Sequence, residues 1–254
     1  LGSVDKTGAG TLTYSGANTY TGDTNVNAGV FTVQGGSAIA DTGTVAVASG
    51  ATFDVDNAET IDSLNAAGGG GLTVNHDATL TIGSDGGDSG IAGNVEGAGG
   101  LTQSGAGTAT LSGTNTYNGD TSIDAGTLTV QGGSAIADTG TVAVASGATF
   151  DVDNAETIDS LNAAAGSTVN LDETLTVGSD GGDSTVAGDL GGAGGFSQDG
   201  AGTATLSGTN THAGDTTVDN GGTLRLQGGN AVNDDAAVLV LGTGSVLDVD
   251  AAEI

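Results

Sequence analysis

The chain contains no cysteine, proline, methionine or tryptophan in its 254 residues. The absence of cysteine excludes disulfides and thiolate metal sites. Aromatic residues make up only 3% of the chain, so few large side chains are available to fill a thick globular core. No run of 18 apolar residues occurs, and we therefore expect no segment of this chain to insert into a membrane.

Positive charge is almost absent as well. The chain has 31 acidic residues against two basic ones, Lys6 and Arg225, which gives a formal net charge of −29. A surface of this sign repels phosphate backbones and anionic lipid headgroups. Nucleic acid is therefore excluded as an expected partner.

Glycine and small apolar residues are abundant. The chain has 50 glycines, and 36% of its residues are hydrophobic, which is too apolar for a disordered polar chain. This composition is typical of a thin core of Val, Leu, Ile and Ala with glycine at many turns. It predicts β-structure wound as a solenoid.

A long internal duplication organises the sequence. Residues Thr32–Ala67 recur without change as Thr129–Ala164. The wider pattern gives long repeats of about 96 residues at 8–104, 105–199 and, incomplete, 200–254. We expect 1–254 to be a single continuous solenoid segment of a longer protein. Duplication also argues against a single, unique active site.

Short alternating runs within one repeat predict strands that break at turns such as Ala28-Gly29 and Ser49-Gly50. Their spacing predicts about four coils of roughly 24 residues in each long repeat and about ten coils in all. Residues 58–67 have a weak helical spacing, but a strand bent at Asp62-Ser63 fits them better. The runs are Thr11–Tyr14, Val26–Val33, Val45–Val55, Leu72–Ile82, Ile91–Val95 and Leu101–Gln103.

Large apolar residues recur at fixed phases of the repeat, where they are expected to form the core. An aromatic residue exchanges with leucine at these phases, which indicates interior sites defined by volume and apolarity. The two sets are Tyr14, Leu111 and Leu206, and Phe53, Phe150 and Leu247.

The segment from Gly8 has the pattern G-x-G-T-x-T-x-S-G-x-N-T-Y-x-G-D-T, which recurs from Gly105 and, with His212 in place of tyrosine, from Gly200. This pattern resembles the passenger-associated repeat of bacterial autotransporters. The resemblance implies a right-handed parallel β-helix in a protein secreted from, or displayed on, the outer surface of a bacterium. All three copies carry Asp where the family often has a second glycine, at Asp23, Asp120 and Asp215.

One acidic motif is a candidate for calcium. Ser84–Ser89 reads S-D-G-G-D-S and recurs as Ser179–Ser184. Two aspartates separated by glycines can supply the hard oxygen ligands that Ca²⁺ prefers, although an ordinary solvated turn has the same composition. The candidate ligands are Asp85, Asp88, Asp180 and Asp183. No other metal or cofactor is expected.

Catalysis has little support in the sequence. The two histidines, His76 and His212, are isolated, and neither position is histidine in the other repeats. No catalytic residue is assigned, and a polysaccharide-cleaving carboxylate pair is only a minor alternative. Thr-x-Thr pairs raise an ice-binding alternative, but they occur in only some coils, which breaks any continuous array. The pairs start at Thr11, Thr79, Thr108, Thr174 and Thr203.

The sequence favours a non-enzymatic structural or adhesive module, acting as a stiff acidic spacer with a multivalent display surface. The expected location is extracellular or on the bacterial outer membrane. Expected partners are glycans or proteins on host or neighbouring cells. The alternative is a self-assembling filament or matrix subunit, in which copies stack end to end or laterally.

Overall fold

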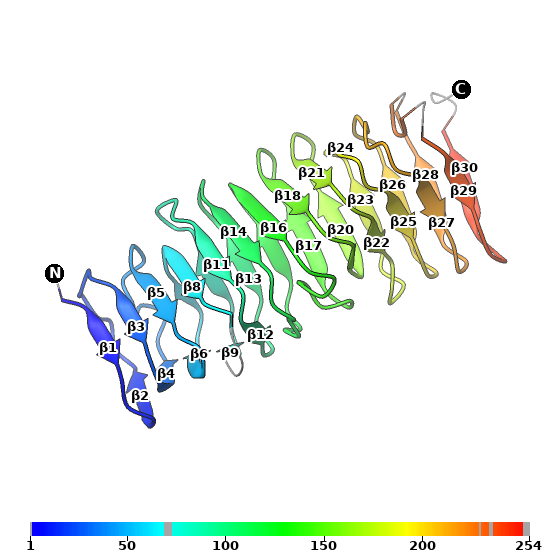
Figure 1. Ribbon diagram of the computed structural model, residues 1–254. Helices are drawn as coiled ribbons and strands as arrows, with labels where there is room; N and C mark the ends of the chain where they lie inside the picture. The colour runs from blue at the N-terminus through cyan, green and yellow to red at the C-terminus, as the bar shows by residue number, and fades with distance from the viewer. Residues whose placement is uncertain (1, 69–72, 229, 234–235, 251–254) are drawn as a thin grey trace. The chain divides into compact units, whose positions relative to one another are not determined.

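A computed structural model of the chain describes residues 2–68, 73–228, 230–233 and 236–250 (Figure 1). The described residues form strands and turns, with no helix among them that could cross a membrane. They divide into two compact units, Leu1–Leu128 and Thr129–Ile254, with the division inside β16 (Thr127–Val130). Each unit is a solenoid of parallel strands, and the predicted all-β solenoid is thus confirmed.

The first unit holds three parallel sheets, each built from strands of successive coils. Side-chain hydrogen bonds between neighbouring coils join residues 19 to 25 positions apart, most of them 20 to 22, so most coils are shorter than the expected 24 residues. One sheet contains β1 (Val4–Lys6), β3 (Thr24–Val26), β5 (Thr44–Val47), β8 (Ser63–Ala66), β11 (Ser89–Ile91) and β14 (Thr108–Leu111). The second contains β7 (Glu59–Thr60), β10 (Leu80–Ile82), β13 (Leu101–Gln103) and β15 (Thr121–Ile123). The third contains β2 (Thr11–Tyr14), β4 (Gly29–Val33), β6 (Ala51–Val55), β9 (Thr73–His76) and β12 (Asn94–Glu96).

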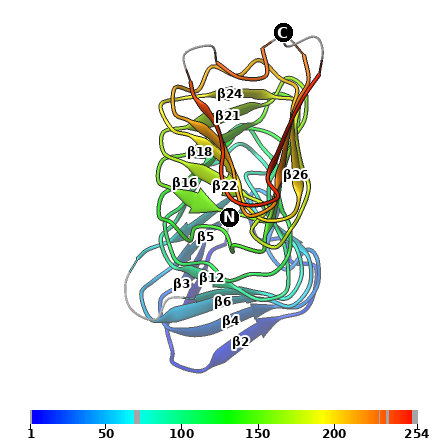
Figure 2. The ribbon, with the colours of Figure 1, turned by 90° about the vertical axis from the view of Figure 1, so that its right-hand side faces the viewer.

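The second unit has the same construction, and Figure 2 shows β21 and β24 on one of its faces and β26 on another. One sheet contains β17 (Thr141–Val144), β20 (Ser160–Ala163), β23 (Ser184–Val186), β26 (Thr203–Leu206), β28 (Thr223–Leu226) and β30 (Val246–Val249). Another contains β18 (Thr149–Val152), β21 (Thr168–Leu171) and β24 (Asp189–Gly191). The third contains β19 (Glu156–Thr157), β22 (Leu175–Val177), β25 (Phe196–Gln198), β27 (Thr216–Val218) and β29 (Val238–Val240).

The strand boundaries follow the alternation in the sequence closely. The run 26–33 breaks into β3 and β4 at Ala28, and 45–55 breaks into β5 and β6, as the turns predict. Residues 58–67 form β7 and β8 with a bend at Asp62, so the strand interpretation of this segment is confirmed. Leu72, the predicted start of the next run, lies outside the described residues.

The core consists of ladders of apolar side chains that stack between coils. Phe31 pairs with Phe53 and Phe53 with Val74, and the two phenylalanine rings are stacked with centroids 6.2 Å apart. In the second unit Phe150 pairs with Val169, which pairs in turn with Leu190. All six side chains are fully buried or nearly so, because a parallel register places one apolar residue directly above another.

Two residues depart from the predicted core phases. Tyr14 is only half-buried, although Leu111 and Leu206 are fully buried. Leu247 was expected in the core at the same phase as Phe53, but it is 37% exposed. Its strand β30 pairs with β28 on one side, and no described strand covers its other side.

Candidate functional site: the repeated corner

The N-T-Y-x-G-D-T part of the repeat forms a corner of the coil whose asparagine lies inside. Asn115 and Asn210 are 2% and 3% exposed. In each copy the side-chain amide bonds to the backbone of an adjacent coil, so it satisfies a peptide group that the corner removes from the strand ladder. The bonds are Asn18 Nδ2 to Ala38 O (2.9 Å), Val95 N to Asn115 Oδ1 (2.8 Å) and Leu190 N to Asn210 Oδ1 (3.2 Å).

The tyrosine of the same motif is tied to the threonine four residues later. Tyr117 is fully buried, and its hydroxyl lies 2.6 Å from Thr121 Oγ1. Tyr20 makes the same contact with Thr24 at 2.7 Å, and burial raises the pKa of Tyr20. Because a buried hydroxyl needs a partner, the spacing of Tyr and Thr in the motif has a structural cause.

The glycine of the motif is needed because two coils approach closely. A Cβ on Gly119 would lie 2.4 Å from the carbonyl carbon of Gly99, and one on Gly214 would lie 2.5 Å from that of Gly194. These distances are well below van der Waals contact, so no larger residue fits without moving the backbone. The motif therefore specifies a tight corner in which the glycine position admits no side chain.

A buried donor before the G-x-G-T turn was missed in the sequence. Gln103 is 1% exposed, and its Nε2 donates to Gly105 O at 3.0 Å and Gly107 O at 3.2 Å. Lys6 occupies the same phase, is 7% exposed, and donates to Ala28 O at 2.8 Å. The signal was available: Lys6, Gln103 and Gln198 are the polar residues two positions before each glycine turn. One of the two basic residues of the chain is thus buried inside the coil.

Two buried glutamates were also missed. Glu59 and Glu156 are each 2% exposed, and both oxygens of each carboxylate accept hydrogen bonds from backbone amides of the preceding coil. For Glu156 the donors are Ile136 N at 2.9 Å and Ala135 N at 3.2 Å. Burial raises the pKa of Glu156 to about 7 and also raises that of Glu59, against the opposing effect of the amide bonds.

The predicted calcium ligands lie at coil corners, where two of them bond to backbone amides. Asp88 Oδ1 accepts a hydrogen bond from Thr108 N at 2.8 Å, and Asp183 Oδ1 accepts one from Thr203 N at 2.7 Å. The amide of Asp85 donates to Asp62 Oδ1 at 3.0 Å. The equivalent bond in the second unit joins Asp180 N to Asp159 Oδ1 at 3.1 Å.

Asp62 and Asp159 therefore order the two S-D-G-G-D-S turns, a contact that the sequence did not predict. No group of three or more His, Asp or Glu side chains that could hold a metal ion is found in the described parts of the chain. Calcium binding stays a prediction that only a titration can test.

The histidines cannot serve a surface reaction in this fold. His76 and His212 are both fully buried, so neither is accessible to a substrate. The structure also argues against the ice-binding alternative. Thr110 pairs with Gly90, which carries no hydroxyl. A continuous two-column hydroxyl array is interrupted there.

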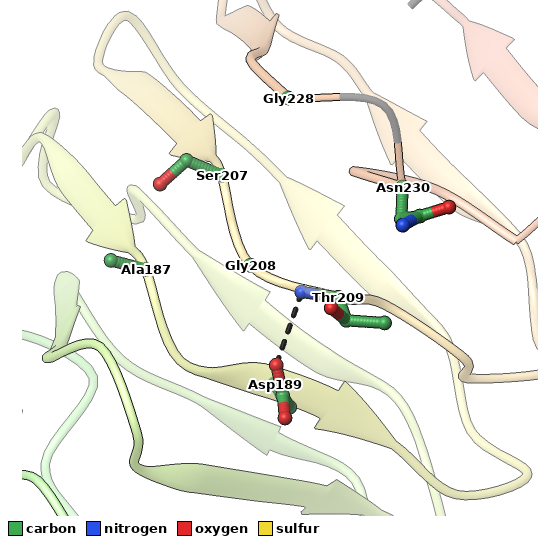
Figure 3. Close-up of a pocket in the computed structure, with 7 residues that line it drawn as sticks. All are labelled: Ala187, Asp189, Ser207, Gly208, Thr209, Gly228 and Asn230. Atoms are coloured by element: carbon green, nitrogen blue, oxygen red, sulfur yellow. Dashed lines mark hydrogen bonds between the residues drawn. The ribbon is translucent and has the colours of Figure 1, made fainter.

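The described surface of the second unit has two shallow hollows near these corners. Figure 3 shows one of about 300 Å³, lined by Ala187, Asp189, Ser207, Gly208, Thr209, Gly228 and Asn230. Asp189 Oδ1 accepts a hydrogen bond from Thr209 N at 3.1 Å across this hollow. The other, of about 560 Å³, carries three carboxylates, from Asp172, Glu173 and Asp215. Both are polar and carry negative charge.

Comparison with known proteins identifies the repeat. The family model described as Passenger-associated-transport-repeat matches residues 4–34, 101–130 and 196–226. The chain is also 39% identical over 135 residues to the adhesin BmaC autotransporter of Brucella suis biovar 1 (strain 1330). That alignment covers 48% of this chain but only 4% of the relative's length. No solved structure shows significant similarity to the chain.

Each matched range contains one copy of the corner described above, with the motif Asn-Thr-Tyr or Asn-Thr-His. The resemblance to autotransporter passenger domains is thereby confirmed. This resemblance implies a location outside the bacterial cell or on its outer-membrane surface.

Proposed function

We propose that this chain, an autotransporter passenger segment, is a non-enzymatic spacer and adhesive display module. The observation that carries the proposal is the recurrence of the same corner bonds in equivalent positions. The Tyr–Thr and Glu–amide contacts of the first unit have counterparts at Thr216 and Glu156 in the second. A chain built this way presents equivalent outer surfaces repeatedly, which suits weak contacts that gain strength through multivalency.

The charge distribution supports the same proposal. Lys6 is buried, and Arg225 pairs with Asp248 at 2.8 Å, so neither cation offsets the acidic exterior elsewhere. Like-charged modules repel each other sideways, which keeps neighbouring copies apart on a crowded surface. The partner class that fits is a glycan or protein of neutral or positive character on another cell.

The relative's name supports adhesion as the role of the whole protein. Adhesion predicts that beads coated with the chain bind to host or neighbouring bacterial cells and that soluble chain competes for this binding. Added salt should weaken binding to a positively charged partner and leave binding to a neutral partner unchanged. Equal attachment of coated and uncoated beads would contradict the proposal.

Self-assembly by coil stacking is the second candidate, because a solenoid can join copies through the strand edges of their coils.

Sedimentation velocity at increasing concentration separates the two candidates. Stacking predicts a sedimentation coefficient that rises with the concentration of the chain. A sedimentation coefficient that does not change from micromolar to near-millimolar concentration would exclude stacking and leave the display role.

A further inference from the structure

Each unit contains one histidine in its apolar interior. His76 and His212 are fully buried, and no described residue makes a hydrogen bond to Nε2 of His76 or Nδ1 of His212. An unpaired neutral nitrogen in the interior already costs stability. A protonated ring in the same place would bury a charge and an unpaired N–H donor, which costs far more.

Neighbouring coils lie close to the ring of His76. Its ring lies 5.3 Å from that of Tyr117, and its Nδ1 lies 3.3 Å from Ala78 O. A Cβ on Gly99 would come within 2.6 Å of Nδ1, so the intervening coil reaches the ring only because it lacks a side chain. On β6 the residue in register with His76 is the apolar Val55.

Few charged groups are near enough to stabilise a protonated His76. Asp77 attracts the charged form, but its own side chain is exposed, as is that of Glu96 on β12. On β6, Asp54 already accepts hydrogen bonds from Thr32 and Asn75.

His212 replaces the tyrosine of the repeat and keeps its contact with the threonine, but its ring carries a second polar atom that a tyrosine ring lacks. Its Nε2 lies 2.9 Å from Thr216 Oγ1, as the tyrosine hydroxyl does in the first unit. Thr211 and Ala213 on either side bond to the backbone of Leu190 and Gly192, which fixes the ring in the coil. The acidic residues on the neighbouring described segments, Asp189 and Asp215, are exposed.

We propose that His76 and His212 make the two units sensitive to mild acid, because protonation of either ring opens the coil around it. Burial lowers the pKa of both histidines, and for His76 the Ala78 bond and Asp77 oppose this shift. In the unfolded chain a histidine has a pKa of about 6.5. The unfolded state therefore takes up protons first, and stability is lost as the pH falls below that value.

The chain supplies its own replacement residues for a test. The position of His76 is occupied by Leu171 in the second repeat, and that of His212 by Tyr117. Both of these residues are fully buried in their own coils. The variants His76→Leu and His212→Tyr therefore place at each site a residue that this fold already accepts.

The experiment measures thermal midpoints of the whole chain, its two single variants and the double variant, at pH 7.5 and pH 5.5. The buried glutamates act in the opposite direction, but they are present in all four proteins and cancel in the differences. We expect the double variant's advantage over the parent to be larger at pH 5.5 than at pH 7.5, by roughly 2 °C or more. An advantage that is equal at the two pH values would overturn the proposal.

Nuclear magnetic resonance of labelled histidine in the parent chain gives an independent readout. We expect both rings to remain neutral in the folded state at pH 6, where an exposed histidine is largely protonated. Folded-state titration of both rings at or above their ordinary pKa would overturn the proposal, even if a variant failed to fold. Circular dichroism at pH 7.5 identifies any such variant.

Discussion

Glu156 Oε1 accepts a hydrogen bond from the amide of Ile136, 20 residues earlier, at 2.9 Å inside the second unit. The first unit repeats this contact between Glu59 and Ile39 at 2.7 Å. In both units a carboxylate thus ties a turn of one coil to the next coil, at a position where the strand ladder is interrupted. The same burial makes this group responsive to pH.

The buried carboxyl of Glu156 should make the folded chain less stable as the pH rises from about 4.5 to about 7. Its pKa is raised to about 7 in the folded state, so the unfolded chain ionises first and the folded state loses relative stability as the pH rises through this window. The full effect is on the order of 3 kcal/mol. Glu156→Gln should remove this component of the pH dependence of urea unfolding.

The matched control for Glu156 is Glu173→Gln, because Glu173 is exposed. It should leave the slope of stability against pH unchanged. A parent chain whose stability has the same pH slope as Glu156→Gln would show that the buried carboxyl does not titrate in this window.

Much of this fold was accessible from the sequence, because strand alternation and repeat phase are local signals. The break of 45–55 and the bend at Asp62 were predicted from turn residues alone. The contacts of the buried carboxylates of Glu59 and Glu156 were not, because the sequence alone does not show which glutamate is buried. Only the register between coils shows which carboxylates face amides and which face water.

Gly113→Ala tests the close approach of coils at the corner. A Cβ on Gly113 would lie 2.0 Å from Gly93 O, whereas a Cβ on Gly16, at the same phase of the first copy, has nothing within 4 Å. We expect Gly113→Ala to cost about 1–3 kcal/mol and Gly16→Ala to change stability by less than about 0.5 kcal/mol. Equal effects of the two substitutions in chemical unfolding would contradict the assigned contact.

Tyr117→Phe tests the polar bond of the motif. The substitution removes the hydroxyl 2.6 Å from Thr121 Oγ1 and keeps the ring. We expect a loss of about 1–3 kcal/mol because a buried hydroxyl loses its partner. Tyr20→Phe should cost less, since Tyr20 is only half-buried. A larger loss at Tyr20 in guanidinium unfolding would reverse this order and refute the explanation.

Phe53→Ala tests the core ladder. Phe53 is fully buried between Phe31 and Val74, so its truncation leaves a cavity. The expected cost is about 3–5 kcal/mol, measured by urea unfolding. Leu247→Ala should cost far less, because Leu247 is 37% exposed. A Phe53→Ala cost no greater than that of Leu247→Ala would show that the ladder does not stabilise the unit.

Deletion of residues 8–104 from the surface-displayed protein tests the adhesive, multivalent role most directly. The deletion joins Thr7 to Gly105, which is equivalent to Gly8, so it removes one long repeat and preserves the phase of the coil. Multivalent display predicts that attachment to partner cells, measured under flow, falls by about tenfold or more, because avidity multiplies across sites. Undiminished attachment, with normal amounts of protein on the surface, would contradict the account.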